Sequence, residues 1–215
     1  MNKFEVSPLF AIPFYRSNLG YLPKDIHDTI VSLDYERTPG NNNFYSVNKY
    51  VLEIAELKIL KNKIMEHVNN FIYDFLDVKE NMKFNIENSW VNKHKNGDHS
   101  PEHYHGNSLV SGVFYLDADK NSGPISFFKD KTHYNLWTET VRVDFNYQTE
   151  TSSKGSNFYN AQSVQFYPQK GDLILFPSML NHQVSPNEST ITRYSLAFNV
   201  FPRGTAGGVL NTITI

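Results

Sequence analysis

The sequence predicts a mainly β fold with flanking helices, a barrel or jelly roll covered by helices on one outer face. Two periodicities predict it: apolar residues recur at helical spacing within the first 80 residues, and from about Met82 onward the period changes to two. The chain is also rich in aromatic residues, with 16 Phe, 13 Tyr and 2 Trp, and these side chains favour strands. Many short strands after a helical start are typical of this architecture.

Two helices are expected in the first part of the chain. A short one is predicted over residues 24–33, directly after Pro23, and a long amphipathic one over residues 50–77, packed across a sheet. His67 lies on the apolar stripe of the longer helix, so we interpret it as a core or boundary residue and not as a ligand. The stripe consists of Ile54, Leu57, Leu60, Ile64, His67, Val68, Phe71 and Phe75.

Short strands are expected through the rest of the chain, separated by clusters of Gly, Pro, Asn and Asp. We expect one domain, residues 1–215, in which 1–80 form a mixed helical support region and 82–202 form the β core. The polar segment 149–160 is expected to be a loop. The predicted strands lie around Phe84 and Ile86 and at 89–92, 109–116, 125–128, 141–145, 164–167, 172–176 and 194–201.

Composition excludes several classes of function. The net charge of −2 provides no electrostatic reason to bind nucleic acid or an anionic membrane. The chain has no cysteine, so disulfides, thiolate metal sites and a cysteine nucleophile are excluded, and any metal must be held by histidine or oxygen donors. No apolar run near the N-terminus is long enough for a signal peptide or a membrane span, and we expect a cytoplasmic location.

Histidines are concentrated in one segment, KHKNGDHSPEHYHG, which holds four of the eight. His103 and His105 stand two positions apart, and on a strand such residues point to the same face, where they can converge on one metal ion. His182, which follows a predicted strand and a Pro-containing turn, is the candidate third ligand. Three facial ligands leave coordination positions open, as non-haem iron oxygenases require. Exposed loop histidines are the alternative interpretation of the pair.

An arginine follows His182 by eleven residues on the last predicted strand. A buried arginine requires an anionic partner because an unpaired buried charge is costly, and its fork suits a carboxylate. A structural Asp or Glu is the alternative partner. Alternation along the strand predicts one face with Arg193, Ser195, Ala197 and Asn199 and the other with Tyr194, Leu196 and Phe198.

The segment from Trp90 to Phe128, with HYH, SGVFYL and GPISFF, resembles the 2-oxoglutarate and iron(II)-dependent oxygenase superfamily. It is most similar to a group of oxygenases common in bacteria and phages. FPSMLNHQVSPN and TRYSLAFNVFP are similar to the second half of that group, and SPLFAIPFYRSNL to its opening segment. The resemblance implies a double-stranded β-helix over 82–202, Fe(II), 2-oxoglutarate as cosubstrate, O2, and decarboxylation to succinate coupled to oxidation, expected to be hydroxylation, of a substrate.

The resemblance also implies roles for three residues. Arg193 and Ser195 match the Arg-x-Ser pair that grips the far carboxylate of 2-oxoglutarate, and Tyr115 matches a tyrosine that often hydrogen-bonds to it. The substrate is not indicated: a small molecule and a protein side chain both fit. No oligomeric state is indicated either.

The chain departs from the family pattern at one metal position. The usual motif is His-x-Asp or His-x-Glu with a distant His, whereas this chain has His105 at the acidic position. Glu102 has the wrong strand parity for the same face, and Asn107 is a poor ligand for iron. Either His105 binds and completes a three-histidine centre, or two histidines act with an unusual third donor.

The remaining candidates receive plainer interpretations. His94 and His99 are expected to flank the site entrance, and His27 and His133 to lie at the surface. The insertion 129–163 is expected to be a lid or specificity element, or equally a structural hairpin. Its candidate substrate contacts are Tyr134, Trp137 and Tyr159.

Two alternative functions remain open. A cupin-type metal-dependent dioxygenase is the first, because Gly97 and the HYH segment mimic the first cupin motif and PSMLNH echoes the second. The usual cupin glutamate is absent, since Leu109 and Val110 occupy its positions, and such an enzyme would not need the arginine–serine pair. A metal-free jelly-roll binding or structural protein is the second alternative. Iron content and succinate formation separate the three functions.

Overall fold

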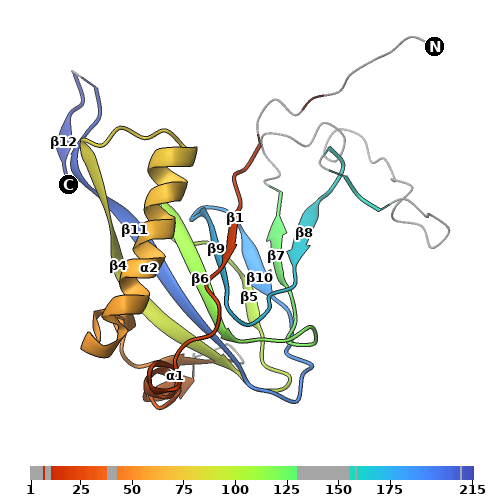
Figure 1. Ribbon diagram of the computed structural model, residues 1–215. Coiled ribbons are helices and arrows are strands. Elements are labelled where there is room, and N and C mark those ends of the chain that lie inside the picture. The colour runs from red at the N-terminus through yellow and green to blue at the C-terminus, as the bar shows by residue number, and fades with distance from the viewer. Residues whose placement is uncertain (1–6, 8–10, 38–42, 130–154, 158, 209) are drawn as a thin grey trace, which may run out of the picture.

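The computed structural model describes residues 7, 11–37, 43–129, 155–157, 159–208 and 210–215 (Figure 1). Within these ranges the chain forms two antiparallel sheets, and helices cover the outer face of the larger one. The predicted mainly β architecture with flanking helices is therefore confirmed. The strand predicted at 141–145 lies outside the described residues. In the described part of the chain, no helix is both long and apolar enough to cross a membrane.

The larger sheet has eight strands, and the smaller has four. In spatial order the larger sheet contains β1 (Tyr15–Asn18), β9 (Asp172–Pro177), β6 (Val110–Asp117), β11 (Arg193–Ala206), β4 (Met82–His94), β3 (Phe44–Ser46) and β2 (Tyr35–Arg37), with β12 (Ile213–Thr214) paired to β11. The smaller sheet contains β5 (Ser100–His103), β10 (His182–Val184), β7 (Ile125–Phe128) and β8 (Ser163–Phe166).

The chain crosses repeatedly between the two sheets. β4 is in the larger sheet, β5 in the smaller, β6 in the larger, β7 and β8 in the smaller, β9 in the larger, β10 in the smaller and β11 in the larger. These eight strands form the double-stranded β-helix that the family resemblance implies. β7, β8 and β10 of the smaller sheet face β6 and β9 of the larger one, and the inner core between them consists of Tyr115, Ala118, Ile125, Phe127, Phe166, Ile174 and Phe176.

A second, larger core lies between the helices and the outer face of the larger sheet. Figure 1 shows α2 (Lys58–Asn69) lying across this face, and α1 (Lys24–Val31) at one end of it. Each fully buried apolar side chain there contributes about 1.5–3 kcal/mol. Among the residues of this core are Ile30, Leu60, Ile64, Val68 and Phe71 from the helical side and Val91, Phe114, Leu173, Leu196 and Phe198 from the sheet.

The prediction of a single long helix over residues 50–77 is wrong in the boundaries of that helix. The segment forms two 3-10 turns, η1 (Val51–Glu53) and η2 (Ala55–Leu57), then α2, then the π-helical turn η3 (Asn70–Phe75). Ile54 separates the first two turns because its backbone is extended, with φ −62° and ψ 129°. The Leu52 N–H donates to Ser89 Oγ of β4 at 2.9 Å, so a tertiary contact competes with the helical bond pattern. His67 is half-buried and bonds to the Tyr15 hydroxyl, as expected of a boundary residue.

Gly112 of β6 makes a close approach to β11 possible. It lies opposite Phe198, and a Cβ at this position would be 2.1 Å from the end of the Phe198 ring. The Phe198 side chain is fully buried in the outer core, so it has no free space into which to move. A glycine is therefore required where the ring crosses the neighbouring strand.

Gly112→Ala is expected to lower the free energy of unfolding by about 1–3 kcal/mol, because the added methyl group overpacks a filled core. Thermal or urea unfolding monitored by circular dichroism measures the effect. Gly155→Ala is the matched control, since a Cβ there meets nothing within 4 Å. Equal stability of the two variants would contradict the packing argument.

Candidate metal centre

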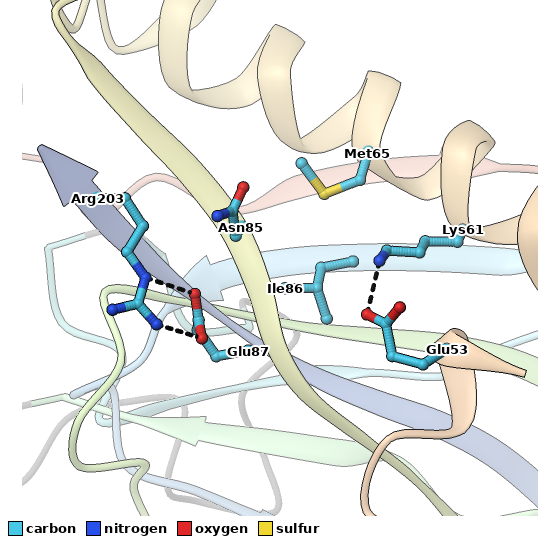
Figure 2. A pocket seen from close by; sticks show the side chains of 7 residues that line it. All are labelled: Glu53, Lys61, Met65, Asn85, Ile86, Glu87 and Arg203. Atoms are coloured by element: carbon cyan, nitrogen blue, oxygen red, sulfur yellow. Dashed lines mark hydrogen bonds and ion pairs between the residues drawn. The ribbon is translucent and has the colours of Figure 1, made fainter.

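One surface pocket lies between α2 and the ends of β4 and β11 (Figure 2). It has a volume of about 470 Å³ and opens to solvent. Its charges neutralise one another, because Lys61 Nζ lies 2.6 Å from Glu53 Oε1 and Arg203 binds both carboxylate oxygens of Glu87 at 2.6 and 3.0 Å. It holds no histidine and no unpaired charge, so we place the candidate site elsewhere, between the two sheets.

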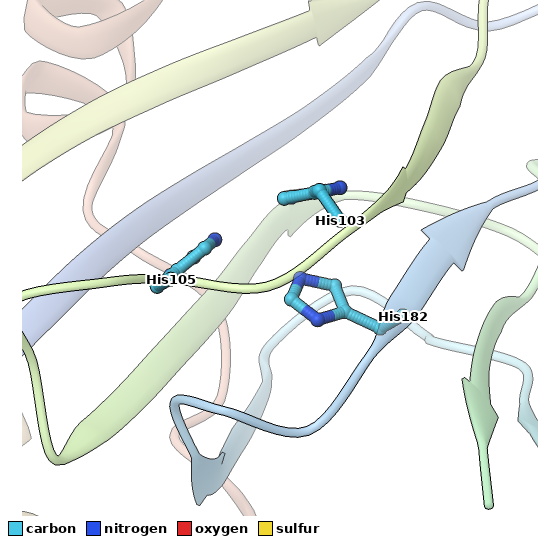
Figure 3. Close-up of side chains that lie close together, drawn as sticks. All are labelled: His103, His105 and His182. Atoms are coloured by element: carbon cyan, nitrogen blue, oxygen red, sulfur yellow. The ribbon is translucent and has the colours of Figure 1, made fainter. Parts of the chain in front are cut away.

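Three histidines converge inside the double-stranded β-helix (Figure 3). His103 ends β5 and lies directly opposite His182, the first residue of β10, while His105 follows His103 by two positions. One nitrogen of each ring lies within 4.8 Å of the others. The ring centroids are 4.3 Å apart for His103 and His182, 5.1 Å for His105 and His182, and 5.3 Å for His103 and His105. The structure thus brings the three predicted ligands together.

Backbone carbonyls fix the orientation of two of these rings. His103 Nδ1 lies 2.8 Å from the Pro101 carbonyl oxygen, and His182 Nδ1 lies 2.8 Å from that of Leu180. A carbonyl oxygen only accepts, so each Nδ1 must carry the proton, which leaves the lone pair on Nε2. This is the tautomer that metal-binding histidines adopt when Nδ1–H bonds to a second group.

His105 is held by a polar network instead of a backbone carbonyl. Its Nδ1 lies 2.7 Å from Asn199 Oδ1 and 2.8 Å from Ser111 Oγ. Ser111 bonds to Asn199 and to Ser178, Ser178 donates to Ser108, and Ser108 donates to backbone carbonyls of β6 and β11. Because Asn199 Oδ1 is an amide oxygen and only accepts, the proton between it and His105 lies on Nδ1 of the histidine.

Burial keeps the His105 and His182 rings neutral. Burial lowers the pKa of His182 to about 3, and the hydrogen bond to Leu180 opposes this shift only in part. Burial also lowers the pKa of His105, against the opposing effect of the Asn199 hydrogen bond. Neutral rings with free Nε2 lone pairs are suited to a divalent metal ion such as Fe(II). Within the described ranges no carboxylate joins the group, so the donor set is three imidazoles.

The inner face of β11 connects this cluster to a second polar region. Ser195 lies between Tyr115 of β6 and Asn92 of β4, and Asn199 lies beside Ser111. Arg193, at the beginning of the strand, lies opposite His94. The predicted alternation is confirmed, since the intervening residues Leu196 and Phe198 pack in the outer core.

Arg193 is buried without a counter-charge. Its side chain is 1% exposed, and Nη1 donates to the carbonyls of Ser122 at 2.5 Å and Gly123 at 3.1 Å. Nε and Nη2 have no partner, and in the described structure no carboxylate pairs with this residue. Burial lowers the pKa to about 10, with Tyr115 acting in the opposite direction, so the guanidinium is charged at neutral pH. Two unfilled donors on a buried cation indicate a site for an anion.

The turn that supplies these carbonyls is held rigidly. Gly123 has φ +79°, and a Cβ there would lie 2.5 Å from the Pro186 carbonyl oxygen. Asp119 accepts hydrogen bonds from the hydroxyl groups of Ser122 at 3.0 Å and Ser189 at 2.7 Å. One end of the guanidinium is therefore fixed, and the other end is left for a ligand.

Residues 88–199, more than half of the chain, match the protein-family model described as "Putative 2OG-Fe(II) oxygenase". The chain belongs to this family of 2-oxoglutarate (2OG) and Fe(II) oxygenases. Membership implies Fe(II) and 2-oxoglutarate, together with O2 and a substrate, and it indicates an enzyme. No curated protein matches the sequence.

Solved structures of oxygenases share the fold. A prolyl-4-hydroxylase from Pseudomonas putida is 15% identical, with a TM-score of 0.53 over 87% of this chain and 92% of that one. HygX from Streptomyces hygroscopicus, with nickel, 2-oxoglutarate and hygromycin B bound, is 11% identical, with a TM-score of 0.57 over 88% and 82%. A 2OG-Fe(II) oxygenase family oxidoreductase from Burkholderia pseudomallei is 13% identical, with a TM-score of 0.55 over 82% and 75%. At these identities the likeness shows the fold alone.

One histidine of this 2OG-Fe(II) oxygenase lies elsewhere than predicted. His94 is 1% exposed and does not flank an entrance, because the inward face of β4 carries it to Arg193. His27 is half-buried, and its Nε2 lies 2.6 Å from Asp117 Oδ2. Of the predicted contacts in the insertion, Tyr159 is 47% exposed. His133, Tyr134 and Trp137 lie outside the described residues.

Asn199 was not singled out as a site residue from the sequence, although the alternation placed it on the correct face. In Asn199→Leu, His105 loses the amide acceptor, so its Nδ1–H tautomer should become less populated and metal affinity should fall about 10–100-fold. Long-range 1H–15N correlation spectra of metal-free protein report the tautomer, and titration with Fe(II) reports the affinity. His103 and His182 are internal controls because their acceptors are backbone carbonyls. An unchanged His105 pattern would show that Asn199 does not position this ring.

Proposed function

We propose that the protein is a 2-oxoglutarate-dependent dioxygenase in which His103, His105 and His182 hold Fe(II). It couples the oxidative decarboxylation of 2-oxoglutarate to the hydroxylation of a substrate. The observation that carries this proposal is the buried Arg193, whose two unfilled donors lie on the same sheet face as the partner of His105. A cupin-type dioxygenase or a metal-free jelly-roll protein has no need of such a group.

Fe(II), when bound, supplies the redox chemistry by which O2 is activated and 2-oxoglutarate is decarboxylated. The chain contributes three neutral donors whose tautomers are fixed by Pro101, Leu180 and Asn199. Because none of the ligands is charged, the ion keeps one more positive charge than in a site with a carboxylate. This charge favours the binding of an anionic cosubstrate.

Arg193, Ser195 and Tyr115 hold the far carboxylate of 2-oxoglutarate. Ser195 and Tyr115 are direct neighbours across β11 and β6, and Arg193 precedes Ser195 by two positions on the same face. Burial raises the pKa of the Tyr115 hydroxyl, so it remains a hydrogen-bond donor. The guanidinium supplies the charge, and the two hydroxyl groups supply further donors.

The substrate approaches from the side of His103, the least buried of the three histidines, where Tyr104 is 55% exposed. Both a small molecule and a protein side chain suit this open edge. Neighbours in fold include a prolyl-4-hydroxylase and a protein with hygromycin B bound, so the fold does not select between the two classes.

Wild-type protein is expected to bind one Fe(II) per chain. His103→Ala and His182→Ala should each abolish this binding, because two neutral ligands are too few to retain a labile divalent ion. Metal analysis after anaerobic loading and desalting measures this. His105→Ala decides whether that position ligates, and His105→Asp should retain iron because it restores the family pattern. His99→Ala is the control from the same segment. Stoichiometric iron in the His103 or His182 variant would contradict the assignment of these histidines as metal ligands.

Arg193→Ala is expected to weaken 2-oxoglutarate binding by about 2–5 kcal/mol without loss of iron, because a charge-assisted pair is removed. Arg193→Lys should recover part of the affinity, since an ammonium group cannot reproduce the fork. Anaerobic titration of the iron-loaded protein measures binding through its weak metal-to-ligand charge-transfer absorbance.

Arg203→Ala is the matched control, because this arginine is half-exposed and paired with Glu87 outside the site. No absorbance band and no succinate in air from wild-type protein would overturn the cosubstrate assignment. Wild-type affinity in Arg193→Ala would overturn only the role of that residue.

A further inference from the structure

We propose that His94 is a further cosubstrate-binding residue, whose Nδ1–H donates to the same carboxylate that Arg193 holds. This inference rests on the proposed function and extends the proposed 2-oxoglutarate site to a residue of β4. The two side chains are each 1% exposed and belong to directly opposed residues of β4 and β11, so they share the inner face of the sheet.

Unpartnered polar atoms gather at this point. In the described residues, the buried side-chain atoms without a hydrogen bond include Arg193 Nε, Arg193 Nη2 and His94 Nδ1. Buried polar groups are nearly always paired, because an unpaired one costs about 1–3 kcal/mol. Three such atoms on two facing side chains therefore indicate one missing ligand and not three independent defects.

The partners of His94 determine which ring nitrogen carries the proton. His94 Nε2 lies 3.1 Å from Ser100 Oγ, and Asn43 Nδ2 donates to the same oxygen at 3.3 Å. The Asn43 amide group supplies a donor to Ser100 Oγ and no acceptor, so of these two partners only His94 Nε2 can accept the proton of the Ser100 hydroxyl. The ring proton then lies on Nδ1, which makes the unpartnered atom a donor.

The protonation state of His94 determines which ligand suits the pair. Burial lowers the pKa of His94 to about 2, and the charge of Arg193 lowers it further in the same direction, so the ring is neutral. The pair therefore has one positive charge and several unpartnered N–H donors on the same face of the sheet. A single carboxylate matches it, because one negative charge and two oxygens with several lone pairs can satisfy Arg193 and His94 together.

The position of His94 is fixed from the backbone side. Asn187 Nδ2 donates to the His94 carbonyl at 2.9 Å and to that of Ile191 at the same distance. The end of β4 is thereby joined to the loop that precedes β11, and the His94 ring bridges from β4 to Ser100 of β5. A residue that only bridged the sheets would need its Nε2 contact and not a free Nδ1–H.

Two substitutions separate the binding role from the bridging role. The side-chain nitrogen of Asn lies near the position of Nδ1 of a histidine, and that of Gln lies near the position of Nε2. His94→Gln should weaken 2-oxoglutarate binding about tenfold or more, the loss of one hydrogen bond to a charged group. His94→Asn should recover most of the affinity. Anaerobic calorimetry of the iron-loaded proteins measures both, with His99→Gln as the control from the same segment.

A bridging role predicts the reverse order, with His94→Gln close to wild type and His94→Asn impaired, and that order would overturn the proposal. Iron content and thermal unfolding verify that each variant is loaded and folded. Long-range 1H–15N spectra of metal-free wild-type protein measure the His94 tautomer independently. A ring protonated on Nε2 would also overturn the proposal. If wild-type protein fails to bind 2-oxoglutarate, the proposed function fails as well. If it binds and His94→Gln binds equally, only the role of His94 fails.

Discussion

The alternation of side chains along β11 is the constraint on which the rest of the site depends. This strand lies between β6 and β4 in the larger sheet, so both of its edges are paired. Leu196 and Phe198 point to the helices, which forces Arg193, Ser195 and Asn199 to the interior. A shift of register by one residue would exchange the two sets and bury charge under the helices. The outer core and the site are therefore specified by the same pattern.

Two polar regions of the interior differ in how completely their hydrogen bonds are made, the one around His105 and the one around Arg193. Around His105, the Asn199 oxygen and the chain of serine hydroxyl groups give each ring and hydroxyl proton an acceptor. Around Arg193, one guanidinium nitrogen is anchored on two carbonyls while the others remain free, beside a histidine with a free nitrogen. Because unpaired buried groups are costly, this asymmetry is the reason for which we propose the cosubstrate site at Arg193.

In the proposed metal site a neutral ligand, His105, stands where the family pattern has a carboxylate, and its surroundings fit that exchange. The groups that contact its Nδ1 are an amide oxygen and a hydroxyl, which hold the imidazole without adding charge. A carboxylate at Asn199 would draw the ring proton and make the ring a more anionic ligand. The neutral acceptor and the neutral ligand are thus consistent with a metal ion whose charge is balanced by the cosubstrate.

The change of hydrophobic period, the parity of β11 and the spacing of His103 and His105 were readable from the sequence, because each is a local property of one segment. The family resemblance implied the roles that we propose for Arg193 and Tyr115, which no local pattern contains. Only the tertiary structure decided that residues 50–57 do not continue the α-helix, because Ser89 accepts a hydrogen bond from the Leu52 N–H. It also carried His94 to Arg193 and Asn199 to His105, pairs about a hundred residues apart. Such contacts depend on which strands become neighbours, and the balance of burial and hydrogen bonding over the whole chain selects that arrangement.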